Sequence, residues 1–314
     1  MNKKTIIGLV IGILCIGIIV LSASASNTQK QVKAPTEKMQ VVASFYPLYF
    51  FSSQIGGDKA EVLNITPSGA EPHDYEPTPK DLAAIQNSNL LILNGAGLEP
   101  WAENVLKGIP TEKVVIAGDR LATLKGEKNE HKDESPHEDV RDPHVWLSPL
   151  HASQMVDTIT IGFVKADPEN NGDYQNNANI LKAKLAELDT DYKSGLASCT
   201  QKNIITSHAA FGYIAKAYNF NQVAIAGLSP EAEPSPKEIA TVAEFAKKNT
   251  VKYIFFESLV SPKLSQTIAN EVGAKTLVLN PIEGLTPEEI ADGKTYLTEM
   301  KNNLTNLRIA LECK

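Results

Sequence analysis

Cysteine is scarce in this sequence, which limits what can hold its fold together. Three of the 314 residues are cysteines, and Cys15 lies in an N-terminal apolar run. Leu14 stands directly before Cys15, where a lipobox needs a small residue, so the pattern argues against lipid attachment there. The other two cysteines, Cys199 and Cys313, allow at most one disulfide in the rest of the chain.

An excess of basic residues is also missing. Lys and Arg number 30 against 37 Asp and Glu, which gives a formal net charge of -7, and no basic stripe is present. Binding to nucleic acid would therefore lack its main electrostatic driving force. Cations are favoured over anions as partners, although net charge bears on association and not on fold.

Long apolar runs are absent apart from one near the N-terminus. That run, residues 5–21, follows two lysines and is apolar but for Thr5. Residues 23–25, Ala-Ser-Ala, then offer a small-residue cleavage site, as in an export signal. Because the run lies at the short end for a membrane helix, an uncleaved anchor is the alternative. In both cases the rest of the chain works outside the cytoplasm.

Export bears on the two remaining cysteines, because an exported protein meets an oxidising or thiol-unprotected compartment. A disulfide between Cys199 and Cys313 is the natural prediction, and two free thiols are the alternative. The bond would close a loop of over a hundred residues. The chain-entropy model values such a closure at about 4–5 kcal/mol at most.

What is present is the composition of an ordinary globular protein, with 42% hydrophobic and 21% charged residues. This composition excludes wholesale disorder. A chain of this length has room for two lobes of roughly 120–150 residues each.

Short apolar segments alternate with helix-like segments from Met39 onward, which predicts an α/β fold with mostly parallel sheets. From about Asn171 to Leu196 the chain has no proline and carries apolar residues on one stripe, which predicts a single long helix. The alternation restarts after Cys199. The predicted strands begin near Met39 and continue with residues 60–67, 89–95, 113–118, 202–208, 222–227, 251–257 and 275–280.

These patterns divide the chain into five segments. We expect a signal peptide or anchor over residues 1–25 and a polar tether over 26–38. An N-terminal lobe is expected over 39–170, a linking helix over 171–197 and a C-terminal lobe over 198–314. Within the first lobe, residues 126–142 form a charged insert that contains His131 and His137, and we expect an exposed loop there.

Three histidines and a glutamate stand out because each lies in a loop punctuated by proline or glycine. Gaps of 71, 64 and 75 residues exclude a site on one helix or hairpin, and any one of these histidines taken alone would more often be structural. The loops fall at or near predicted strand ends, where open α/β sheets bind ligands. Three imidazoles and one carboxylate suit tetrahedral zinc. The four are His73 in EPHDYEPTP, His144 in DPHVWLSP, His208 in TSHAAFGY and Glu283 in LNPIEGL.

Carboxylates near these histidines are candidates to hold the imidazole nitrogen that faces away from the ion. Solvated loop acids, or a helix cap in the case of Glu257, are the alternative interpretations. The candidates are Glu71 and Asp74 around His73, Asp142 before His144, and Glu257 at the end of VKYIFFE. A dry and rigid surround is expected from Pro72, Pro143, Trp146 and Pro281, and His151 is expected to be structural.

The chain resembles the zinc-specific solute receptors of ABC importers, the cluster A-I or cluster 9 family, over residues 39–314. The resemblance rests on five segments in order: EPHDYEPTP, DPHVWLSP, SHAAFGY, GLSPEAEPSP and LNPIEGL. It implies two Rossmann-like lobes joined by one long rigid helix, with a metal ion in the cleft between them. The ligands it implies are His73, His144, His208 and Glu283.

A receptor of this kind binds Zn²⁺ as its cargo and delivers it to an ABC-type membrane permease. The resemblance therefore implies a monomeric, non-enzymatic protein that is periplasmic or lies at the outer face of the cytoplasmic membrane. The charged insert resembles the histidine-rich loop of zinc receptors but is short and poor in histidine.

Three alternatives stay open. A manganese or iron receptor of the same fold is the first. The family resemblance implies a His, His, Glu, Asp ligand set for manganese receptors, so His208 argues for zinc. A metal-dependent adhesin of the same fold would need the same site. A zinc hydrolase is the third, although the sequence has no HExxH motif and four protein ligands leave no position for water.

Overall fold

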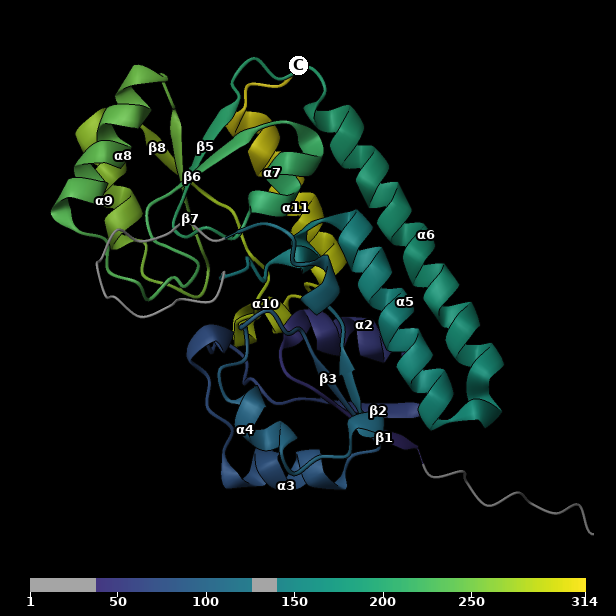
Figure 1. Ribbon diagram of the computed structural model, residues 1–314. Helices are drawn as coiled ribbons and strands as arrows, with labels where there is room; N and C mark the ends of the chain where they lie inside the picture. The colour runs from purple at the N-terminus through teal and green to yellow at the C-terminus, as the bar shows by residue number, and fades with distance from the viewer. Residues whose placement is uncertain (1–37, 126–139) are drawn as a thin grey trace, which may run out of the picture. The chain divides into compact units, whose positions relative to one another are not determined.

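The computed structural model describes residues 38–125 and 140–314 (Figure 1). The predicted export segment, the tether apart from Lys38, and the part of the insert that holds His131 and His137 lie outside these residues. Within the described ranges, no helix combines the length and the apolar character needed to cross a membrane.

Two parallel sheets with the same strand order form the framework of the described chain. The first is ordered β2-β1-β3-β4 and the second β6-β5-β7-β8, and neighbouring strands in both run parallel. This confirms the predicted α/β fold with parallel sheets. The strands are β1 (Met39–Ala43), β2 (Ala60–Asn64), β3 (Leu90–Leu93), β4 (Val114–Ile116), β5 (Asn203–Thr206), β6 (Asn221–Ala224), β7 (Tyr253–Phe256) and β8 (Lys275–Val278).

Local sequence sets the ends of several helices. The helix α3 starts at a proline behind a capping box of Thr78 and Asp81, and α2 ends at Gly57, whose φ of 53° suits glycine. The helices are α2 (Tyr46–Gly56), α3 (Pro79–Asn87), α4 (Ala102–Leu106), α5 (Pro149–Ala166), α6 (Asn171–Leu196), α7 (Gly212–Tyr218), α8 (Pro236–Lys248), α9 (Lys263–Val272), α10 (Pro287–Ala291) and α11 (Tyr296–Ala310).

The long helix predicted between the two strand–helix series is α6, which has 26 residues. It packs against α5 and α2 from the first series and against α7 and α11 from the second, and Figure 1 shows it running alongside α5. Its buried stripe includes Leu181, Leu185 and Leu188. The apolar periodicity therefore identified both the helix and the face that it buries.

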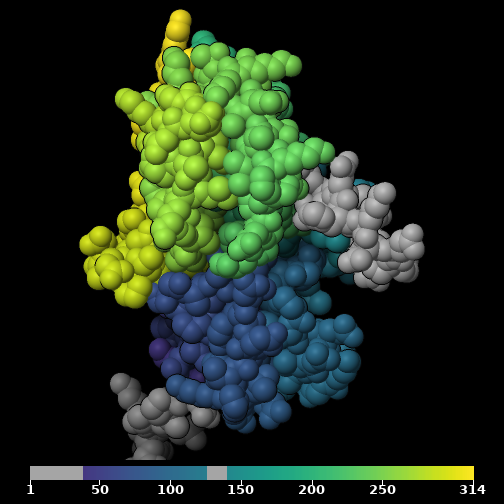
Figure 2. Space-filling model, turned by 90° about the vertical axis from the view of Figure 1, so that its left-hand side faces the viewer, coloured from purple at the N-terminus to yellow at the C-terminus, as the bar shows by residue number. Residues whose placement is uncertain are grey.

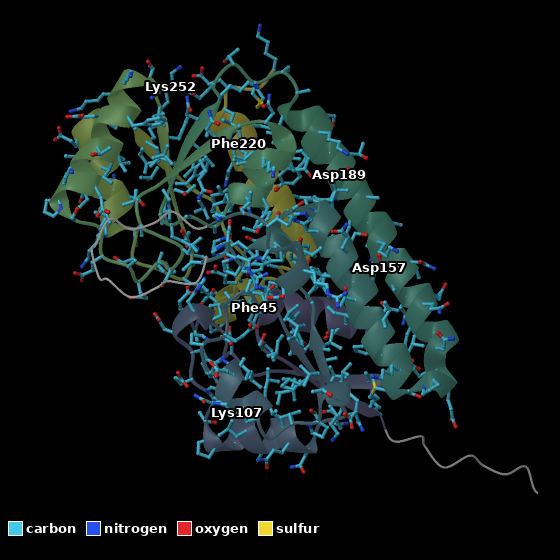
Figure 3. The ribbon with its side chains drawn as sticks, in the orientation of Figure 1. Phe45, Lys107, Asp157, Asp189, Phe220 and Lys252 are labelled. Atoms are coloured by element: carbon cyan, nitrogen blue, oxygen red, sulfur yellow. A yellow bond between two sulfur atoms is a disulfide. The ribbon has the colours of Figure 1, made fainter. Side chains whose placement is uncertain are left out.

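One hydrophobic core runs through side chains of both series. It joins Val41 of β1 and Phe45 to Phe211 and Tyr296 of the second series. The ring centroids of Phe45 and Trp146 lie 4.7 Å apart; in Figure 3, Phe45 lies in the interior, whereas Lys107 and Lys252 lie at the periphery. Figure 2 shows the blue and green halves in contact on one face of the molecule.

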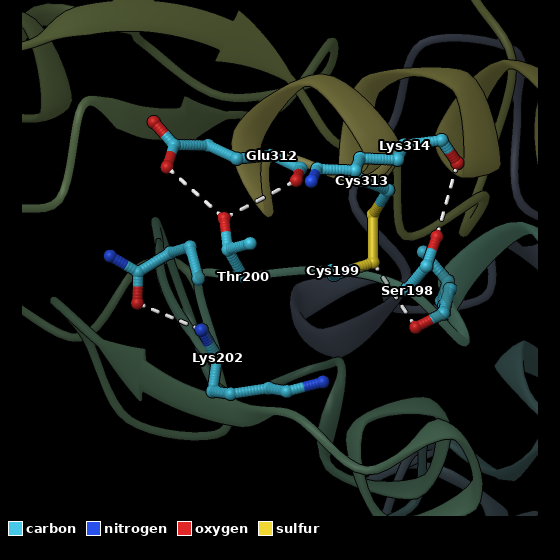
Figure 4. Close-up of a disulfide and its surroundings, with 9 residues drawn as sticks. Ser198, Cys199, Thr200, Lys202, Glu312, Cys313 and Lys314 are labelled. Carbon is cyan, nitrogen blue, oxygen red and sulfur yellow. Dashed lines mark hydrogen bonds between the residues drawn. A yellow bond between two sulfur atoms is a disulfide. The ribbon is translucent and has the colours of Figure 1, made fainter.

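The predicted disulfide between Cys199 and Cys313 is confirmed. It joins the segment after α6 to the segment after α11, and the two cysteines also form an antiparallel β-bridge. The Oγ of Ser198 donates a hydrogen bond to the carbonyl of Lys314 at 3.1 Å beside it (Figure 4).

Candidate metal centre

The four residues singled out by sequence come together in the structure. His73 lies in a single 3₁₀ turn after β2, and His144 immediately precedes another 3₁₀ turn, Val145–Leu147. His208 follows β5 and Glu283 follows β8. The first sheet and its following loops thus supply two side chains, and the second sheet supplies the other two.

Five of the six separations between the donor atoms of these four side chains are nearly equal. The Nε2 atom of His144 lies 3.3 Å from Nε2 of His73 and 3.3 Å from Nε2 of His208. The Oε1 atom of Glu283 lies 3.3, 3.2 and 3.4 Å from the same nitrogens of His73, His144 and His208. All four donors lie within 4.8 Å of one another, so the group can hold one metal ion.

Burial separates His73 from the other three. His144 and His208 have no exposed surface and Glu283 has 1%, whereas the side chain of His73 is 9% exposed. Bulk water is therefore kept from most of the group. An ion would reach it from the side of His73.

Two buried carboxylates orient two of the imidazoles. Asp142 Oδ1 lies 2.7 Å from Nδ1 of His144, and Glu257 Oε1 lies 2.7 Å from Nδ1 of His208. Because a carboxylate accepts, each Nδ1 carries the proton, and the lone pair of Nε2 points at the common centre. Lone pairs and a carboxylate that converge in a buried space repel one another unless a proton or a cation lies between them.

Burial and the neighbouring charges shift the pKa values of His208 and Glu283 in opposite directions. Burial lowers the pKa of His208, but the charges of Glu257 and Glu283 outweigh burial and raise it well above the usual value. Burial raises the pKa of Glu283, yet the charge of His208 and hydrogen bonds from the three imidazoles keep it well below its usual range. A metal ion bound by His208 would compete with its proton, so binding would weaken as the pH falls through that raised pKa.

His73 is held differently from the other two histidines. Burial lowers its pKa, which favours the neutral imidazole. In the described residues its ring makes no hydrogen bond with Glu71 or Asp74, the two carboxylates that flank it in sequence. Neither oxygen of Glu71 has a hydrogen-bond partner, and burial together with the charge of Glu283 raises the pKa of Glu71 to about 9.

The four residues expected to give the site a dry and rigid surround are buried. They are Pro72, Pro143, Trp146 and Pro281. The Nε1 of Trp146 donates a hydrogen bond to the carbonyl of Pro281 at 2.8 Å. This bond links the loop of His144 to the loop of Glu283 across the two halves of the fold. His151, expected to be structural, lies outside the donor group, and its ring centroid is 5.2 Å from that of Tyr213.

The chain is similar to proteins whose descriptions name zinc. The high-affinity zinc uptake system protein ZnuA of Bacillus subtilis strain 168 is 41% identical over 303 residues, which cover 95% of each chain. The Zn(II)-bound ZnuA-like domain of Streptococcus pneumoniae AdcA is 38% identical with a TM-score of 0.73, covering 88% of this chain and 100% of that one.

A third similar protein is described with two activities. The laminin-binding protein Lmb of Streptococcus agalactiae, described as a bifunctional protein with adhesin and metal-transporting activity, is 32% identical with a TM-score of 0.76. The match covers 88% of this chain and 100% of that one. The model of the family described as zinc-uptake complex component A, periplasmic (ZnuA), matches residues 41–310. The chain belongs to this family of extracytoplasmic zinc-uptake components.

Proposed function

We propose that this protein captures one Zn²⁺ ion outside the cytoplasm and delivers it to a membrane permease. The proposed ligands are His73, His144, His208 and Glu283. One observation carries the proposal: five donor separations lie between 3.2 and 3.4 Å. A tetrahedral zinc site with ligand distances of about 2.0–2.1 Å has edges of about 3.3–3.4 Å.

The donor types favour zinc over manganese. Three imidazole nitrogens and one carboxylate oxygen suit a four-coordinate, borderline-soft ion, whereas Mn²⁺ prefers more oxygen ligands and a higher coordination number. A shell of four protein donors also leaves no position for a reactive water, so we propose a binding role without catalysis.

The split origin of the ligands provides a route to release. We propose an N-terminal lobe over residues 39–170, a linking helix over 171–197 and a C-terminal lobe over 198–314. A small separation of the lobes would withdraw two ligands of the four, and α6, which packs on both, would limit that movement. Docking on an ABC-type permease would drive the separation.

The partner and location follow from the same proposal. We propose a monomeric receptor held near the outer face of the membrane, by an uncleaved N-terminal segment if the signal is retained. Adhesion is a second candidate function, because the similar protein Lmb is described as both an adhesin and a metal transporter.

Calorimetric titration of metal-free protein with Zn²⁺, Mn²⁺ and Cu²⁺ tests the main proposal. We expect one Zn²⁺ per chain and tighter binding of Zn²⁺ than of Mn²⁺. Preferential retention of Mn²⁺ would overturn the choice of metal, and a lack of binding by all three ions would overturn the function.

Glu257→Gln should weaken zinc binding even though Glu257 is not a proposed ligand. The change keeps the shape but removes the charge that holds the Nδ1 proton of His208, and losses of such partners typically cost about 10- to 100-fold in affinity. Chelator competition measures the effect. The control is Glu271→Gln on α9, which alters an exposed ion pair with Lys247 of α8 and should leave zinc binding unchanged. Equal effects of the two changes would refute an orienting role.

A further inference from the structure

The loop that carries Glu283 has an unusual backbone. Ile282, the residue just before the glutamate, has a φ of 59°, in the left-handed region. A β-branched residue is disfavoured there, so the surrounding structure must impose this conformation. The left-handed residue turns the chain between β8 and Glu283, and it therefore decides where the carboxylate lies.

Asn280 is the immediate source of the constraint. Its Oδ1 accepts a hydrogen bond from the backbone N–H of Ile282 at 2.7 Å, which closes the turn from inside. Asn280 is 1% exposed and Ile282 is fully buried. Water therefore cannot substitute for this bond if the side chain of Asn280 moves.

Asn303 of α11 fixes Asn280 from the other side. Its Oδ1 accepts from the backbone N–H of Asn280 at 2.8 Å, and its Nδ2 donates to the carbonyl of Asn280 at 2.6 Å. Asn303 is itself only 3% exposed. One amide side chain thus satisfies both backbone groups of Asn280, a pairing that an apolar or a charged side chain could not supply.

The same helix also contacts the loop of His144. Tyr296, the first residue of α11, donates a hydrogen bond from its hydroxyl to the carbonyl of Trp146 at 2.5 Å. Trp146 stands two residues after His144, and its indole donates to Pro281. The helix α11 therefore supports one ligand loop from each half of the fold.

We propose that Asn303 is a positioning residue for Glu283: through Asn280 it holds Ile282 left-handed and places the carboxylate against the three imidazoles. This rests on the proposed zinc site. In this proposal α11 contributes no ligand, but its contacts decide whether the ion is held by four donors or by the three imidazoles alone.

The test compares two asparagines of the same helix. Asn303→Leu keeps the branched outline of the side chain and removes both bonds to Asn280. Asn306→Ala is the matched control, because Asn306 Nδ2 donates to the carbonyl of Val278 at the end of β8 and not to the turn. Both variants lose contacts between α11 and either β8 or the segment that follows it, so thermal unfolding measures their structural cost separately.

We expect Asn303→Leu to weaken zinc binding about 10- to 100-fold, the usual range for loss of a ligand-supporting contact. Asn306→Ala should bind zinc as the unaltered protein does. The visible absorption of the Co²⁺-loaded protein should change in Asn303→Leu toward that of Glu283→Ala, and should be unchanged in Asn306→Ala, because only the first loses the oxygen ligand.

A double variant decides between positioning and general damage. If Asn303 acts through Glu283, then Asn303→Leu should cause no further loss of affinity in a Glu283→Ala background. A full additional loss in that background, or unchanged affinity and spectrum in Asn303→Leu alone, would overturn the inference. Absence of zinc binding by the unaltered protein would instead refute the proposed function. If Asn303→Leu does not fold, Asn303→Ala is measured in the same way.

Discussion

His208→Ala should lower the affinity for zinc by at least ~100-fold. Zinc held by four protein ligands is bound with apparent energies of about 10–16 kcal/mol, or about 3 kcal/mol for each ligand, and 1.4 kcal/mol is worth tenfold. The substitution removes a nitrogen donor that lies 3.4 Å from Glu283 Oε1. It also leaves the buried carboxylate of Glu257 without the imidazole that it contacts at 2.7 Å.

The control for this prediction is another histidine. His151→Ala removes an imidazole that packs on Tyr213 and lies outside the donor group, so zinc affinity should stay within error. Competition with a chromophoric chelator measures both variants on the same scale. Unchanged affinity in His208→Ala would show that the ligands are wrongly assigned, and equal losses in both variants would point to destabilisation of the fold.

The fold was predictable where burial follows a simple period. Strands such as β3, with four buried residues in a row, and the leucine stripe of α6 carry their structure in the order of their apolar residues. The helix α11 was not predicted. Its buried face includes the polar residues Glu299 and Asn303, so the apolar stripe is interrupted where the helix hydrogen-bonds to the loop of Glu283.

The candidate site was likewise predictable only in part. Residue types, proline and glycine loops and strand ends pointed to the four proposed ligands, because carboxyl ends of parallel strands face one edge of a sheet. Which carboxylate meets which imidazole depends on tertiary contacts. Adjacency in sequence indicated Asp142 correctly for His144, but it suggested Glu71 and Asp74 for His73, and neither bonds to its ring.

Removing the disulfide should produce the largest change in stability. In the chain-entropy model, a bond that closes a separation of 114 residues restricts the unfolded chain by about 5 kcal/mol at most. For a protein of this size, roughly 2–4 °C is lost for each kcal/mol. We therefore expect Cys199→Ser with Cys313→Ser to lower the melting temperature of the metal-free protein by roughly 10 °C.

Zinc affinity at room temperature should change little in the same double variant, because neither cysteine contacts a proposed ligand and the strand-like pairing around the bond remains. The backbone N–H of Gln201 still donates to the carbonyl of Leu311 at 3.0 Å, so the folded ends stay together without the bond. Scanning calorimetry measures the change in melting temperature. It compares the variant with the unaltered protein, with and without a reductant. A shift of the melting temperature by only a degree or two would mean that the cross-link hardly restricts the unfolded chain, because that chain is already compact. A large loss of zinc affinity would instead mean that the disulfide also holds α11 in place, and with it the turn before Glu283.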